Sequence, residues 1–173
     1  MTWTAPEATR SAAPVLAGER EMLEGWLDFH RRTLLKKCSG LTAEQLRRRA
    51  VEPSSLSLLG LVRHMTEVER GWFRIRVAGE HVEFLYSSED DPDGDFDHVD
   101  SADPAEELAT FEREIELARK AAEDRSLDST FFHTRLKTEM NLRWVYVHMI
   151  EEYARHNGHA DLLRESIDGA TGY

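Results

Sequence analysis

Three histidines and one glutamate recur at helical spacing near the C-terminal end of the sequence. His148, Glu152, His156 and His159 are separated by four, four and three positions. This spacing places the four side chains along one face of a single helix, at positions that core residues usually take. A carboxylate buried on such a face is costly unless it is paired or coordinated. The pattern therefore indicates either a buried ion pair or a metal site to which one helix contributes two ligands.

A further ligand has to come from another helix, and His64 is the candidate. It lies within the apolar stretch Leu58–Met65, with Leu61 and Val68 about one turn away on either side. A histidine in these surroundings needs a hydrogen-bond partner or a metal ion. Two histidines and one glutamate, with no cysteine, leave a coordination position open, as catalytic zinc sites do. The residue types alone leave a second interpretation open, in which His64 is a hydrogen-bonded core residue and Glu152 belongs to an ion pair.

Four long helices must position these side chains, because apolar residues recur at helical spacing through most of the chain. Asp103 followed by Pro104 is a strong helix start, and Gly169 is a typical helix terminator. The expected helices span residues 15–39, 53–79, 103–122 and 140–167.

A short connecting helix is expected after the first long one. Thr42 and Gln45 form a capping box at its start. Leu41 and Leu46 supply the hydrophobic staple that often accompanies such a box. The segment 80–102 is irregular and long enough to cross over between the second and third long helices. With no convincing strand signal, the sequence predicts an all-α fold, a four-helix bundle with a short connecting helix and a long crossover loop.

The acidic stretch 88–97 invites comparison with a calcium-binding loop. An EF-hand loop needs Gly at its sixth position and an acidic residue at its twelfth. With Gly94 as the sixth residue, the first would be Glu89 and the twelfth Asp100, whereas the motif has Asp and Glu at these two positions. We therefore expect a solvated loop here.

The chain is expected to divide into an extended N-terminal arm at residues 1–14, a single domain at 15–169 and a tail at 170–173. Trp3 on the polar arm predicts that the arm packs back onto the body. Cys38 is the only cysteine, which excludes an intramolecular disulfide. No histidine lies near it in sequence, so a catalytic role for this thiol is disfavoured.

Composition and charge restrict the partners of the protein. The 173 residues are 40% hydrophobic, and 33 acidic against 22 basic residues give a formal net charge of −11. A field of this sign repels phosphate backbones and anionic lipid headgroups, which disfavours nucleic acids and membrane surfaces. No stretch has the length and apolar character of a signal peptide or a membrane span. We expect a cytoplasmic protein whose partner is a small-molecule substrate.

Three stretches of the sequence carry a resemblance to a known family. They are residues 57–73 around His64, residues 144–152, and the run Arg155–Glu165 that contains His156. Together they resemble the DinB/YfiT-like superfamily of metal-binding four-helix bundles. Many of its members bind metal with three histidines, whereas this chain has Glu152 four positions before His156. In having glutamate at this position, the chain resembles the branch of the superfamily that includes mycothiol-dependent maleylpyruvate isomerase.

The resemblance implies a ligand set and a reaction class. The implied ligands of one divalent metal ion are His64, Glu152 and His156, with zinc the first expectation and nickel the second. The implied activity is that of a transferase or isomerase that uses a low-molecular-weight thiol such as mycothiol. The metal lowers the pKa of this thiol, and the thiolate attacks a small electrophile.

Several neighbouring residues are candidates for supporting roles. Glu67, Arg155 and His159 are expected to orient the ligands or line the pocket, and His30 is a candidate to reach the same cavity from the first helix. One alternative function is a metal-dependent hydrolase that activates water with Glu67 or His159 as the base. Another is a non-catalytic metal-binding or stress-response module. Bundles of this kind often pair through helix faces, so a homodimer is expected.

Overall fold

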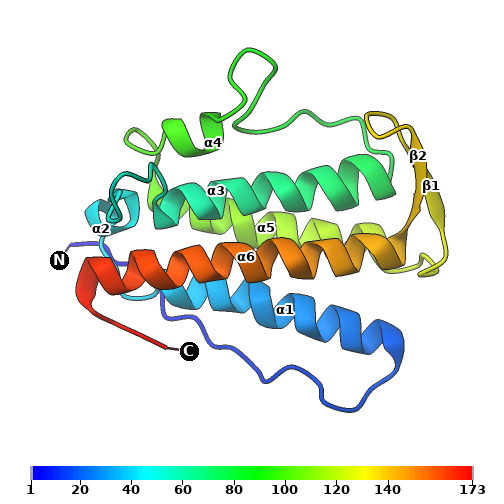
Figure 1. Ribbon diagram of the computed structural model, residues 1–173, viewed down its shortest axis with the longest axis horizontal. Coiled ribbons are helices and arrows are strands. Elements are labelled where there is room, and N and C mark those ends of the chain that lie inside the picture. The colour runs from blue at the N-terminus through cyan, green and yellow to red at the C-terminus, as the bar shows by residue number, and fades with distance from the viewer. Residues whose placement is uncertain (1, 173) are drawn as a thin grey trace.

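The computed structural model describes residues 2–172 and is mainly helical (Figure 1). Its long helices are α1 (Glu19–Cys38), α3 (Leu58–Glu69), α5 (Pro104–Ala122) and α6 (Leu142–Asp168), and the π-helix η1 (Arg70–Val77) continues α3. The shorter elements are α2 (Ala43–Arg47), α4 (Gly94–Asp97), β1 (Thr130–His133) and β2 (Thr138–Asn141). The long helices lie side by side, with α1 against α6 and α3 against α5. A mostly helical fold is confirmed, and its four-helix-bundle topology stays a prediction.

The predicted ends of the last two long helices are correct to within one or two residues because they depend on local signals. The side chain of Asp103 accepts a hydrogen bond at 3.0 Å from a backbone N–H in the first turn of α5. Asn141 caps α6 in the same way at 2.9 Å. Gly169 ends α6 in the left-handed conformation, with φ of 78°. Both halves of the predicted capping box of α2 are also present.

The predicted starts of the first two long helices are wrong. α1 begins after Val15 and Leu16, which are 97% and 94% exposed. Their apolar side chains continue the helical pattern in sequence but pack against nothing. The second long helix begins at Leu58 rather than at residue 53, because Ser57 supplies the cap by accepting a hydrogen bond at 3.1 Å from a backbone N–H of the first turn.

A small β-hairpin lies in the linker before α6, where the sequence indicates no strand. β1 and β2 are antiparallel, with Thr130 opposite Asn141 and His133 opposite Thr138. Each strand has only four residues, and His133 is the single buried one among them. Strands this short and this exposed give almost no alternation of apolar and polar residues. The predicted all-α class is therefore corrected to a mainly helical fold with one two-stranded sheet in residues 2–172.

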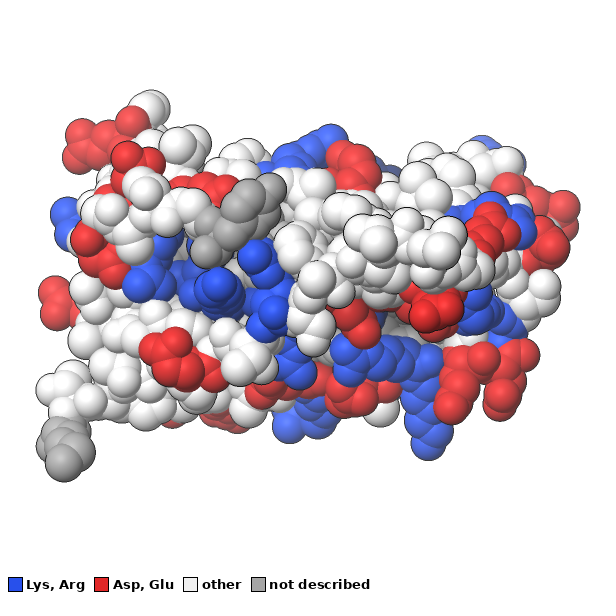
Figure 2. All heavy atoms as spheres, turned by 90° about the horizontal axis from the view of Figure 1, so that it is seen from below, with Lys and Arg blue, Asp and Glu red and all other residues white. Residues whose placement is uncertain are grey.

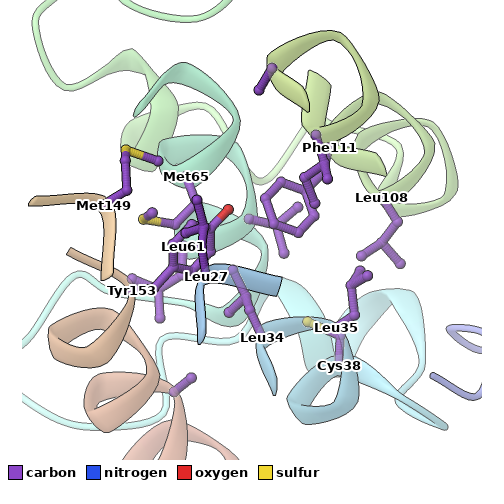
Figure 3. Close-up of a cluster of buried hydrophobic side chains, with 14 of the residues drawn as sticks. Leu27, Leu34, Leu35, Cys38, Leu61, Met65, Leu108, Phe111, Met149 and Tyr153 are labelled. Atoms are coloured by element: carbon purple, nitrogen blue, oxygen red, sulfur yellow. The ribbon is translucent and has the colours of Figure 1, made fainter. Parts of the chain in front are cut away.

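The hydrophobic core lies between the long helices, and all four contribute to it (Figure 3). Its buried side chains include Leu27, Leu34 and Cys38 of α1, Leu61 and Met65 of α3, Phe111 of α5, and Met149 and Tyr153 of α6. Because α3 and α6 share this core, polar residues on their adjoining faces are brought together.

The N-terminal arm is extended and pairs with the body of the protein. The N–H of Ala5 donates to the carbonyl of Leu41 at 2.8 Å, and the N–H of Gly40 donates to the carbonyl of Ala5 at 3.0 Å. Ala5 is buried, whereas Trp3 is 36% exposed. Backbone pairing therefore holds the arm, rather than the burial of its aromatic residue.

The outer surface carries charges of both signs. Figure 2 shows Lys and Arg side chains interspersed with Asp and Glu on the face seen from below. Two ion pairs link α1 to α5, namely Asp28 with Arg119 at 2.8 Å and Arg32 with Glu112 at 3.1 Å. None of the helices in the described part of the chain is both long and apolar enough to cross a membrane.

Candidate metal centre

α3 and α6 bring His64, Glu152 and His156 together. Each offers one nitrogen or oxygen atom, and these three atoms all lie within 4.8 Å of one another. Nε2 of His156 lies 3.5 Å from Oε2 of Glu152. Ligand atoms about 2.1 Å from a tetrahedral zinc ion lie roughly 3.4 Å apart, so a small adjustment of side chains suffices to hold one. The His64 ring also approaches that of His156, with centroids 4.7 Å apart.

His64 is held in place by a buried carboxylate from the crossover segment. Its Nδ1 lies 2.8 Å from Oδ2 of Asp95, a residue of α4 that is only 4% exposed. The Phe96 ring stacks on the imidazole, with centroids 5.0 Å apart. A Cβ on Gly60 would meet Phe96 at 3.0 Å, so the glycine allows α4 to approach α3 this closely. With Nδ1 donating to Asp95, Nε2 of His64 is left as the metal-binding atom.

Asp95 is the functional residue that the sequence did not reveal. The expectation of a solvated loop for residues 88–97 is wrong at this position, because α4 folds inward and buries the carboxylate against His64. Phe96, the only apolar residue in the acidic stretch, was the signal that this turn packs on the body.

Asp95→Asn is expected to weaken metal binding roughly 10–100-fold, because a neutral amide orients His64 less firmly and adds less to its basicity. The dissociation constant for Zn²⁺, measured by competition with a chromophoric chelator, checks this. Asp97→Asn is the matched control, because Asp97 lies in the same short helix and is exposed. Equal affinities for the two variants would show that Asp95 has no role at the centre.

His156 meets the requirements for a neutral metal ligand. Burial, followed by the nearby charges of His64 and His159, lowers its pKa to about 4, so the ring is unprotonated at neutral pH. Its Nδ1 is buried without a hydrogen-bond partner among residues 2–172, and so is Nδ1 of His159. The two rings lie edge to face, 5.4 Å apart. Two neutral imidazoles, one carboxylate and unpartnered nitrogen atoms are a donor set that fits a divalent ion.

A comparison with protein-family models places the chain in a known group. A family model described as Mycothiol-S-transferase matches residues 22–169. The chain belongs to the mycothiol-S-transferase family. This family is part of the DinB-like superfamily, so the resemblance seen in the sequence is confirmed. Searches of curated proteins and of solved structures gave no match.

The described residues of this mycothiol-S-transferase family member contain a second group with metal-binding potential. It consists of His148, Glu151 and Glu152, and it shares Glu152 with the first group. Glu151 is exposed and forms an ion pair with Arg155. An exposed acid with a cationic partner is a poorer ligand than a histidine oriented by a buried carboxylate, which favours the group that contains His64.

The residues expected to support the centre take different places. Glu67 is buried, but its two oxygens accept hydrogen bonds from the backbone N–H groups of residues 85–87, so it anchors the crossover segment. Arg155 is exposed and reaches the centre only through its charge, which lowers the pKa of His156. Of these three residues, only His159 contacts a candidate ligand.

His30 and Cys38 lie apart from the ligand group. His30 lines a cavity of about 350 Å³ together with Trp26 and Asn157, and none of the candidate ligands lines that cavity. Cys38 is buried in the core, and burial raises the pKa of its thiol to about 12. A thiol in this state is neither accessible nor ionised, so Cys38 does not supply a nucleophile.

Proposed function

We propose that the protein is a metal-dependent mycothiol S-transferase with His64, Glu152 and His156 as the metal ligands. The proposal is carried by the convergence of these three donors from α3 and α6 within a segment that matches the family. The expected metal is zinc, with nickel second, held in a DinB-like four-helix bundle. A cytoplasmic location and a homodimer remain predictions.

In the proposed reaction, some residues of the chain would hold the metal ion and others would orient its ligands. A bound divalent ion supplies Lewis acidity, which lowers the pKa of a thiol. Glu152 offsets one unit of the metal charge and so moderates this effect. Asp95 and Phe96 fix the ring of His64. In the transfer, a carbon–sulfur bond forms between the thiol sulfur and the electrophile, the leaving group departs with its bonding electron pair, and the thiol proton passes to solvent.

The hydrolase alternative is weakened because one of its two candidate bases is engaged elsewhere. Both oxygens of Glu67 accept backbone hydrogen bonds from the crossover segment. His159 keeps its contact with His156, but that contact does not distinguish a base from a pocket residue.

Metal removal tests the proposal directly. The metal-loaded protein is expected to accelerate the reaction of mycothiol with 1-chloro-2,4-dinitrobenzene, followed by absorbance of the thioether. A chelator should reduce the rate to the uncatalysed background, and added Zn²⁺ should restore it. Replacing mycothiol with cysteine controls for general thiol reactivity. A rate that survives complete removal of the metal would refute a metal-dependent transferase.

A further inference from the structure

An aromatic surface borders the candidate metal centre. Trp72 of η1 and Trp144 and His148 of α6 are in mutual contact, and we call these three residues the aromatic platform. The Trp144 and His148 rings are stacked with centroids 4.8 Å apart, and Trp72 lies 5.3 Å from Trp144 and 4.8 Å from His148. Nε2 of His148 is 3.4 Å from Oε1 of Glu152. The platform therefore continues directly from one of the proposed ligands.

The platform is open to solvent. Trp144 is 41% exposed, and its neighbour on the helix surface, Val147, is 54% exposed. Trp72 and His148 are partly buried. Stacked aromatic rings that stay partly exposed beside a reactive centre are suited to binding a flat apolar molecule.

One edge of the platform carries an arginine whose charge is not balanced by a carboxylate. The guanidinium carbon of Arg76 lies 4.8 Å from the centre of the Trp72 ring. In the described residues no carboxylate forms an ion pair with Arg76. Arg74, two residues earlier in η1, instead pairs with both Glu80 and Glu114. Burial lowers the pKa of Arg76, and the charge of Arg135 lowers it further.

Among residues 2–172, Arg76 donates a hydrogen bond to a histidine ring that a second donor also approaches. Its Nε donates to Nε2 of His133 at 3.1 Å, while the backbone N–H of Leu136 donates to Nδ1 of the same ring at 3.1 Å. Burial and the charge of Arg76 lower the pKa of His133, so the ring is neutral. A neutral imidazole accepts at one nitrogen only, because the other carries the proton. Arg76 and Leu136 thus compete for one acceptor, and an external anion would relieve the competition.

Trp72 and Arg76 both belong to the π-helix η1. Trp72 and Arg76 are four residues apart in η1, and their side chains lie one over the other. π-helices are rare and occur frequently at functional sites. The protein therefore retains an uncommon helix geometry at the place where a cation is set against an exposed aromatic surface.

We propose that Trp72, Trp144 and Arg76 bind the electrophilic substrate, and that this substrate carries a carboxylate or similar anion on a flat apolar body. This inference deepens the proposed function and rests on it for the identity of the reaction. Contacts through Trp72, His148 and Glu152 connect the anion site to the metal centre. A planar acid held by Arg76 would lie with its body on the rings and its reactive carbon toward the ligands.

A binding measurement that needs no turnover tests the site. We expect 4-fluorobenzoate to bind the protein measurably more tightly than the neutral 4-fluorobenzamide, as followed by ¹⁹F NMR titration. Arg76→Met should weaken fluorobenzoate binding roughly tenfold or more, since a charge-assisted hydrogen bond is lost. Arg113→Met is the matched control, because that arginine is exposed and its hydrogen bond in the described part of the chain lies within α5. Arg76→Lys keeps the charge and should give an intermediate affinity.

Two further arms separate this proposal from the metal-dependent reaction. The His156→Ala variant and the chelator-treated protein should still bind fluorobenzoate, so absence of transferase activity alone would leave the anion site standing. With the active protein, Arg76→Met should raise KM for 4-chloro-3-nitrobenzoate and leave KM for its neutral amide unchanged. Equal binding of the acid and the amide by the unmodified protein would overturn the proposal, and so would unchanged affinity in a folded Arg76→Met variant.

Discussion

The His156→Ala variant is expected to lose stoichiometric metal binding and, with it, mycothiol transfer. His156 provides one of only two neutral ligands in the proposed set, and its low pKa keeps it ready to bind at neutral pH. Removal of a ligand should cost more than the roughly 10–100-fold loss that follows from removing a supporting group. Elemental analysis of the purified variant and its affinity for Zn²⁺ in a chelator competition are the measurements.

The control for this variant is His81→Ala. His81 is exposed in the segment after η1 and belongs to neither group with metal-binding potential. This substitution should leave one metal ion per chain, while circular dichroism verifies that both variants are folded. A His156→Ala protein that purifies with a full complement of metal would rule out the ligand assignment.

The parts of the fold that were predicted correctly depend on short-range rules. Asp103 and Asn141 cap their helices by bonding to residues two or three positions away, and Gly169 ends α6 through its own backbone angle. Such signals are complete within a few residues of sequence. The predicted start of α1 was wrong because Leu16 has an apolar side chain that continues the helical pattern. The sequence does not show whether a neighbouring element will cover such a side chain.

The candidate site was predictable to the extent that one helix determines it. The four-residue step between Glu152 and His156 places both on one face of α6 wherever the helix packs. His64 could be assigned to the same site only from its apolar surroundings and from the family resemblance. Asp95 required knowledge of how a crossover segment folds back over α3, which no periodicity encodes.

Glu67 illustrates the opposite error. Its position three residues after His64 suggested a group that supports the centre, yet it faces the crossover segment and binds three successive backbone N–H groups there. A one-turn spacing limits where a side chain points, but the loop that reaches it is decided by the tertiary structure. The same limit applies to a group of buried charges in the core, which the sequence did not reveal.

Those charges form a network in the core. Glu69 is completely buried, and its two oxygens accept hydrogen bonds from Nε and a terminal nitrogen of Arg31, each at 2.7 Å. The hydroxyl of Tyr153 donates to the same carboxylate at 2.7 Å. Burial and the adjacent charge of Glu69 raise the pKa of the Tyr153 hydroxyl, so it remains a donor. The network joins α1, α3 and α6.

Glu69→Ala should therefore lower the free energy of unfolding by about 3 kcal/mol, because it removes the buried partner of Arg31 and leaves this guanidinium only its 2.9 Å ion pair with the partly exposed Asp28. Urea denaturation followed by circular dichroism gives the value. The control is Glu112→Ala, which removes the partner of Arg32 in a solvent-exposed pair and should cost less than about 1 kcal/mol.

The double variant Arg31→Met with Glu69→Leu separates the cost of removing the buried partner of Arg31 from the net contribution of the ion pair to stability. Apolar side chains of similar size restore packing and leave no unpaired charge, so this protein should recover most of the stability lost in Glu69→Ala. Tyr153 would then keep one unsatisfied hydroxyl, which accounts for a remaining loss of roughly 1–3 kcal/mol. If Glu69→Ala were no less stable than Glu112→Ala, the buried network would contribute nothing to the stability of the fold.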